Sequence, residues 1–196
     1  MPRAGLNRAR VTREAAELAD EVGFARLTLA ALAQRLGVRQ PSLYKHVESI
    51  ASLRRDIAVN AKQELGEVLA RASAGRSGAD AVTVMSHAYR RWALEHPARY
   101  EASNLMPAPG DVEDEAVSLA AIQVVADVLT AYHLEGDDAV DAIRAFRSTL
   151  HGFVSYESVG AFRWSTDVDR SFERLVKGFI RTLDDPTTTP TAPQQN

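Results

Sequence analysis

The sequence predicts an all-α protein that consists of a small N-terminal three-helix domain and a larger helical domain. Apolar residues recur at helical spacing along almost the whole chain, and no segment alternates apolar and polar residues for long. With 196 residues and 45% hydrophobic content, the chain can bury a sizeable core. Glycine and proline fall between the periodic segments, where helices are expected to end.

An apolar stripe predicts the first helix, and its members are Val11, Ala15, Leu18, Ala19 and Val22. The stripe stops at Gly23, which ends the helix. Thr28 is suited to cap a second helix, because its hydroxyl can accept a hydrogen bond from a first-turn amide. Gly37 ends this second helix.

The third helix is short and starts around residues 39–41, where Pro41 is tolerated because first-turn amides have no partner within the helix. It is expected to bury Leu43 and Val47. Ser49 then caps a longer fourth helix, which runs to the Gly- and Ser-containing break at 73–78. This fourth helix is expected to connect the small domain to the large one.

Further helices are expected before and after a Pro- and Gly-containing loop at 105–111. They lie around 79–95, after Pro97, and near 112–133, 138–160 and 166–183. The predicted domains are therefore residues 1–48 and residues 49–185. The tail, residues 186–196, is rich in Pro, Thr and Gln and is expected to be disordered.

The charge of the chain is divided unevenly. Residues 1–55 hold ten Arg or Lys and five Asp or Glu, a balance of +5, whereas the remainder holds 13 and 21, a balance of -8. A basic head on an acidic body is what a nucleic-acid binder needs when one end meets phosphates and the other stays away from them.

The composition argues against an enzyme. With no cysteine, the chain has neither a disulfide nor a thiolate metal site. No two of its five histidines stand four residues apart, so no zinc motif and no metal are predicted. Ser155 lies one turn from His151, but no glycine-flanked nucleophile elbow surrounds it. No catalytic residue and no cofactor are therefore expected.

No membrane segment and no export signal are expected either. The apolar stretch 120–129 is interrupted by Gln123 and Asp127 and is shorter than the roughly 20 residues that span a membrane. The N-terminus carries charge without an apolar segment behind it, unlike a secretory signal. The sequence therefore favours a cytoplasmic protein with no membrane partner.

The segment from Thr28 to Val47 joins two short amphipathic helices through a glycine, an arrangement typical of the helix-turn-helix motif. Its second helix leaves polar side chains outward, namely Arg39, Gln40, Ser42, Tyr44, Lys45 and His46. Amide and guanidinium groups can pair with base edges, and hydroxyl, ammonium and imidazole groups can hold phosphates. The composition is therefore that of a DNA recognition helix.

This segment closely resembles the DNA-binding domain of TetR-family transcriptional regulators. In that family a Thr opens the second helix, a Gly forms the turn, and a Leu-Tyr pair with an aromatic-rich end closes the third helix. The resemblance implies phosphate contacts from Thr28, Tyr44, Lys45 and His46, and a major-groove position for Arg39, Gln40, Pro41 and Ser42. Many members place a lysine just after the third helix where this chain has Glu48. Amides at the start of the fourth helix can bind a phosphate there instead.

A single recognition helix covers only a few base pairs, so a homodimer on a palindromic double-stranded operator is expected, with half-sites roughly 34 Å or a multiple apart. The resemblance assigns dimerisation to the last two helices, 138–160 and 166–183, which form a four-helix bundle with their symmetry mates. Segments 91–97 and 151–153 also resemble a Trp/His-Gly (WHG-type) subset of TetR C-terminal domains. The family's usual mode is repression that a small-molecule effector relieves.

The larger domain is therefore expected to bind a small, mainly apolar effector as well as to dimerise. The candidate pocket residues are Trp92, Tyr100, Met106, Tyr132, Phe146, His151 and Tyr156, because ligand pockets are mainly apolar and aromatic. Each of them is also a residue type that commonly fills a core. A helical protein-interaction module without specific DNA binding is the alternative function. Phosphate contacts would distinguish the two, because they make binding fall steeply with rising salt.

Overall fold

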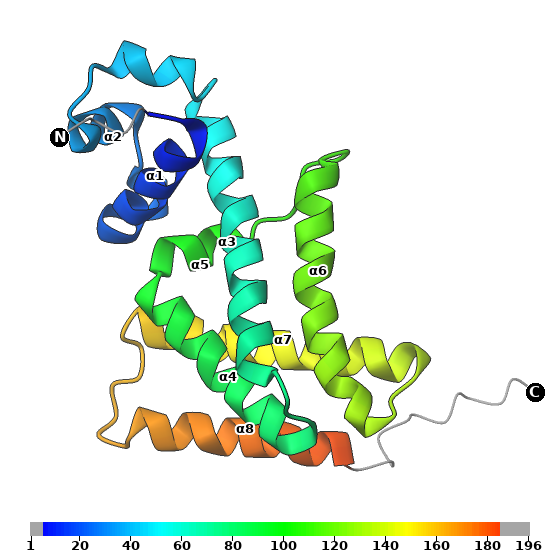
Figure 1. The fold of residues 1–196 in the computed structure, drawn as a ribbon. Coiled ribbons are helices and arrows are strands. Elements are labelled where there is room, and N and C mark those ends of the chain that lie inside the picture. Colours follow the sequence, from blue (N-terminus) through cyan, green and yellow to red (C-terminus); the bar gives the residue numbers. More distant parts are fainter. Residues whose placement is uncertain (1–5, 185–196) are drawn as a thin grey trace, which may run out of the picture. The chain divides into compact units, whose positions relative to one another are not determined.

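The structure is a computed structural model that describes residues 6–184, and every regular element in that range is a helix (Figure 1). This confirms the predicted all-α class. The elements in chain order are α1 (Arg8–Val22), η1 (Phe24–Arg26), α2 (Leu29–Leu36), η2 (Gln40–Lys45), α3 (Ile50–Ser73), α4 (Gly78–Glu95), α5 (Pro97–Ser103), α6 (Val112–Leu129), η3 (Thr130–Tyr132), α7 (Gly136–Ser158) and α8 (Val168–Asp184). The predicted tail at 186–196 lies outside the described residues.

The chain divides into two compact units. Among the described residues, the head unit comprises residues 6–67 and 92–121, and the body unit comprises residues 68–91 and 122–184. Helices α3, α4 and α6 each contribute to both units. The head unit therefore extends well past residue 48, the boundary that the motif alone suggests.

The core of the head unit explains this extension. It contains the apolar faces of α1 and α2, together with the fully buried Leu43. Leu53 and Ile57 of α3 join it, as do Ala98 and Ala102 of α5. A helix about 80 residues further along the chain thus completes the core under the helix-turn-helix.

The body unit contains the antiparallel pair α7 and α8. Phe146 packs against Phe179 with ring centroids 5.4 Å apart, and Phe153 packs against Phe172 at 5.1 Å. Arg90 of α4 stacks over the Phe172 ring at 4.8 Å. These contacts set the core face of α8, which also buries Val176 and Leu183.

Helix α6 is part of a longer apolar segment than the stretch 120–129. The segment Val112–Tyr132 is long and apolar enough to cross a membrane by length and composition alone, although Gln123 and Asp127 interrupt it. Only 11% of its most apolar window is buried. A single helix of this length and composition is weak evidence for a membrane span, because helices of water-soluble proteins pass the same test. The result does show an apolar helix with much of its surface exposed.

Several predicted helix ends move by a few residues. Helix α6 stops at Leu129 and continues as η3, which ends at His133 in a left-handed conformation with φ of 54°. Helix α7 already begins at Gly136 and α8 begins at Val168. The order and number of the long predicted helices are otherwise those of the structure.

Candidate DNA-binding site

The helix-turn-helix is built by local capping, as the sequence predicts. Thr28 Oγ1 accepts the amide hydrogen of Ala31 at 3.2 Å, which starts α2. Gly37 ends α2 with φ of +65°, a left-handed conformation that a side chain would strain. The next element, η2, is a 3₁₀ helix with Pro41 in its first turn. Ser49 Oγ then accepts the Ser52 amide at 3.0 Å and caps α3.

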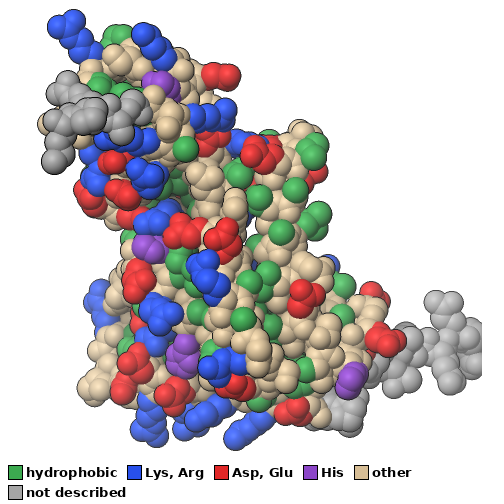
Figure 2. Space-filling model, in the orientation of Figure 1, with side chains coloured by type: hydrophobic (Ala, Val, Ile, Leu, Met, Phe, Trp, Pro, Cys, Tyr) green, Lys and Arg blue, Asp and Glu red, His purple; other side chains and the backbone are tan. Residues whose placement is uncertain are grey.

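The eight predicted DNA contacts lie on one continuous stretch of the head unit, from the start of α2 to the end of η2. Six of them are exposed, namely Thr28, Arg39, Gln40, Pro41, Tyr44 and Lys45. Ser42 and His46 are half-buried. Leu43 and Val47 are buried, which fixes the inward side of η2 and turns its polar groups outward. Figure 2 shows Lys and Arg side chains and a His on the surface of this region.

The cations of the head unit fall into two groups. Most are bound within the chain: Arg35 Nη1 lies 2.7 Å from Glu21, and Arg8 Nη2 lies 2.6 Å from Asp56. Hydrogen bonding to these carboxylates raises the pKa of both guanidinium groups. Arg39 and Lys45, by contrast, have no ion pair or side-chain hydrogen bond with any described residue. The cations without such a partner therefore include both of those in residues 39–46, which we call the recognition segment.

Arg54 is a positioning residue that sequence patterns do not reveal. From α3, its Nη2 donates to the carbonyl oxygens of Ala25 at 3.0 Å and Leu27 at 3.3 Å. The Leu27 carbonyl directly precedes Thr28, so this contact holds the entry to α2. The only signal in the sequence is an arginine in the first turns of a helix, which is common on solvated surfaces.

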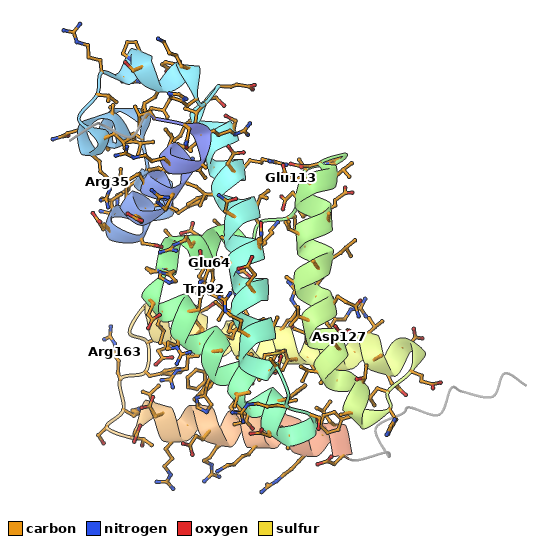
Figure 3. The ribbon with its side chains drawn as sticks, in the orientation of Figure 1. Arg35, Glu64, Trp92, Glu113, Asp127 and Arg163 are labelled. Carbon is orange, nitrogen blue, oxygen red and sulfur yellow. The ribbon has the colours of Figure 1, made fainter. Side chains whose placement is uncertain are left out.

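A second hidden group joins α1 to α5 within the head unit. Asp20 Oδ1 accepts the backbone amides of Ala98 at 2.9 Å and Arg99 at 3.0 Å, and its Oδ2 accepts Arg99 Nε at 2.7 Å. Arg99 Nη1 also donates to Glu64 of α3 at 3.1 Å. Trp92 donates its indole N–H to the same carboxylate at 3.1 Å, and Figure 3 shows Glu64 and Trp92 close together. The head is thereby tied to α3, α4 and α5.

The start of α6 is tied to α3 by charge. Arg55 Nη2 lies 2.5 Å from Asp111, and Arg55 Nη1 lies 2.6 Å from Glu113, which is labelled in Figure 3. The Arg55 hydrogen bond lowers the pKa of the Asp111 carboxyl to about 2, because it favours the charged form. Further along, buried Lys62 and Asp114 form an ion pair at 2.5 Å. These contacts fix α6 on α3 within the head unit.

The seven candidate effector residues are divided between the two units. In the head unit Trp92 and Tyr100 are buried, while Met106 is 87% exposed. In the body unit Phe146 is buried against Phe179, whereas His151 and Tyr156 are exposed. Tyr132 is half-buried, burial raises the pKa of its phenol, and its hydroxyl has no hydrogen-bond partner among the described residues. Within either unit, the candidates do not form one common buried cluster.

Residues 6–184 contain no group of three or more His, Asp or Glu side chains that could hold a metal ion. The groups brought together by the structure are instead those of a surface that can face a duplex. A capped helix, a glycine turn and a short helix with outward polar groups define the class: a helix-turn-helix DNA-binding protein.

Comparison with known proteins gives the family. Residues 11–57 match the description "Bacterial regulatory proteins, tetR family", and residues 82–179 match "Tetracyclin repressor-like, C-terminal domain". The chain is 40% identical over 174 residues to the HTH-type transcriptional regulator Rv0681 of Mycobacterium tuberculosis, covering 88% of this chain and 79% of that protein. It is 32% identical over 187 residues to the HTH-type transcriptional regulator YobS of Bacillus subtilis, covering 93% and 95%.

Among solved structures, the fold matches a TetR protein of Acinetobacter baumannii in complex with minocycline. The TM-score is 0.68 at 23% identity, covering 92% of this chain and 97% of that chain. The chain therefore belongs to the TetR family and is a DNA-binding transcriptional regulator, not an enzyme.

Proposed function

We propose that the protein is a cytoplasmic repressor that binds a palindromic operator as a homodimer and is released by a small, mainly apolar effector. One observation carries the DNA-binding half of this proposal. The segment from Thr28 to His46 directs polar and cationic groups outward from a capped scaffold, and two of its cations, Arg39 and Lys45, have no ion pair with any described residue.

Within this segment we assign two kinds of DNA contact. Gln40 and Arg39 lie at the start of η2, where an amide and a guanidinium can each pair with two atoms of a purine edge. Tyr44, Lys45 and His46 lie at its end and Thr28 at the start of α2, in line with phosphate contacts. Backbone amides at the start of α3 supply a further anion-binding position.

The homodimer is supported by small residues on the outer faces of α7 and α8. On α7 these are Ala145, Ser148, Gly152 and Ser155, and on α8 they are Ser171, Gly178 and Thr182. A Cβ at Gly152 or Gly178 would meet nothing within 4 Å. A mid-helix glycine costs about 1 kcal/mol relative to alanine, and close approach of a second backbone is a physical reason to retain it.

The effector is proposed to be apolar because the head unit exposes apolar side chains on α6 and in the loop before it. Met106, Val112 and Leu119 are 87%, 74% and 66% exposed, and exposed apolar surface commonly marks a binding site. The A. baumannii protein of similar fold was solved in complex with minocycline, which supports a small-molecule ligand here. An effector that favours a displaced α5 would act on the head through Asp20 and Arg99, lowering operator affinity by shifting the population.

The first test is selection of bound sequences from a random pool of double-stranded DNA. Enrichment of a palindrome with half-sites about one helical turn or a multiple apart is the expected result. The enriched site then becomes the probe for an effector screen, in which an active compound releases the DNA. If the folded protein enriched no sequence at low salt, the operator and repressor proposals would both fail. Enrichment of a single half-site would overturn only the dimer.

A further inference from the structure

Helix α8 carries a basic stripe on the face opposite its buried residues. The stripe consists of Arg170, Arg174, Lys177 and Arg181, which stand at i, i+4, i+7 and i+11 and are all exposed. The opposite face, with Phe172, Val176 and Leu183, packs in the core of the body unit. Figure 3 shows long side chains with nitrogen tips that project from α8 away from the rest of that unit.

The carboxylates along this helix pair with only one described member of the stripe, Lys177. Glu173 lies 3.8 Å from Lys177, while Asp169 pairs with Arg90 at 2.7 Å. The other three members of the stripe, Arg170, Arg174 and Arg181, have no ion pair with any described residue. Like charges one turn apart on a helix destabilise it by a few tenths of a kcal/mol per pair. An external anionic surface would relieve this repulsion.

The body unit also has an acidic surface that no described cation neutralises. Glu135, Asp137 and Asp138 at the start of α7 are exposed and have no hydrogen bond or ion pair with described residues. The positive end of the helix dipole favours acidic side chains here, but it neutralises only about half a charge. Within one copy, α7 packs on the core face of α8, so the stripe on the opposite face is out of its reach.

We propose that the acidic start of α7 in one copy binds the basic stripe of α8 in a second copy, and reciprocally. This inference rests on the homodimer of the proposed function and adds what fixes its orientation. A two-fold interface makes every contact twice, so two reciprocal sets of opposite charges form together. Like-charge repulsion disfavours an arrangement in which the two stripes face each other, since eight cations would then come together. The small faces of α7 and α8 then allow the helices to approach.

Two other occupants fit the stripe less well. An anionic membrane would need the apolar face of the amphipathic helix for insertion, and in α8 that face is buried in the core. A nucleic-acid backbone would match the sign of the charge. It would leave the acidic start of α7 without a partner, however, and would repel it wherever both were in reach. A second copy satisfies both surfaces at once.

The test uses the full chain with charge reversals. The basic reversal combines Arg170→Glu, Arg174→Glu and Arg181→Glu, and the acidic reversal combines Glu135→Lys, Asp137→Lys and Asp138→Lys. A third protein carries both sets, and Arg91→Glu reverses an exposed cation outside the proposed interface as a control. Sedimentation measures the dimer dissociation constant at low and high salt. Circular dichroism checks that each variant is folded.

Each single set should raise the dimer dissociation constant at least about tenfold, and the combined set should restore it. An equal mixture of the two single-set proteins should form heterodimers, while Arg91→Glu should dimerise like the unaltered chain. Unchanged dimerisation of either folded single-set protein would overturn the charge pairing and leave the dimer intact. If the basic reversal bound non-specific DNA more weakly and dimerised unchanged, the stripe would be assigned to nucleic acid. That result would also overturn the charge pairing. An unaltered chain that is monomeric would refute the homodimer itself.

Discussion

The recognition segment of the head unit and the outer faces of α7 and α8 both carry charged side chains that form no ion pair with described residues. In the head, Arg39 and Lys45 form no ion pair with described residues, whereas other arginines, such as Arg35, are bound to carboxylates. In the body, three arginines of α8 form no ion pair with described residues, whereas Arg90 is bound to Glu157. The two regions differ in their backbone. The head is a succession of caps and turns, whereas α7 and α8 are long, regular helices.

That difference decides how much each region says about its partner. A glycine turn between two capped short helices is a specific arrangement, and its polar groups match the edges of bases. A long helix with a small face and a charged face fits many partners. The head therefore identifies its ligand as DNA, while the body requires a symmetry argument to identify a second copy.

The largest effect on stability is expected from a cavity in the core of the head unit. Leu43→Ala should destabilise the head by about 2–5 kcal/mol, because Leu43 is fully buried and its removal leaves a cavity under η2. Operator binding should fall with it. Urea denaturation measures the loss, and Leu119→Ala is the control because that side chain is 66% exposed. Equal losses in the two variants would contradict the packing of η2 described above.

The next effect concerns the tie between α1 and α5. Asp20→Ala should cost about 1.5–3 kcal/mol, because it removes a charged acceptor from two backbone amides and from Arg99. Asp20→Asn keeps an acceptor oxygen for the amides and should lose less. Denaturation measures stability, and operator affinity with and without effector measures the coupling. A folded Asp20→Ala protein with unchanged effector release would remove this tie from the proposed switching path.

Local parts of the fold could be predicted from the sequence, and contacts between distant segments could not. Thr28 and Gly37 define α2 through their own capping chemistry, and Leu43 and Val47 follow from helical spacing. All of this lies within 20 residues of chain. The order of the long helices followed in the same way from the punctuation by glycine and proline.

The contact between Asp20 and Arg99 joins residues 79 positions apart, and each reads as an ordinary solvated charge until the fold brings them together. The head unit extends beyond the motif for the same reason, since α5 enters its core from far along the chain. Exposure was equally hidden. The residue type of Met106 does not reveal that its side chain is 87% exposed.

A comparison of Gln40→Ala with Lys45→Ala sharpens the division of roles within the recognition segment. Gln40→Ala should cost about 1–3 kcal/mol on the selected operator and little on random DNA, because an amide reads a base edge. Lys45→Ala should weaken binding to both and lower the slope of log affinity against log salt by about one. Fluorescence anisotropy over a salt series measures both. The same loss on all DNA from both variants would assign Gln40 to the backbone.

The smallest expected effect comes from a substitution that distinguishes the stability of the body unit from its dimerisation. Gly178→Ala should stabilise the isolated chain by about 1 kcal/mol, because alanine favours a helix and its Cβ would meet nothing within 4 Å. If a second backbone approaches that face, the same methyl group should weaken the dimer. Denaturation at low protein concentration and sedimentation at high concentration therefore give changes of opposite sign. A variant that gains in both would place Gly178 outside the interface, and the small face of α8 would no longer support a dimer.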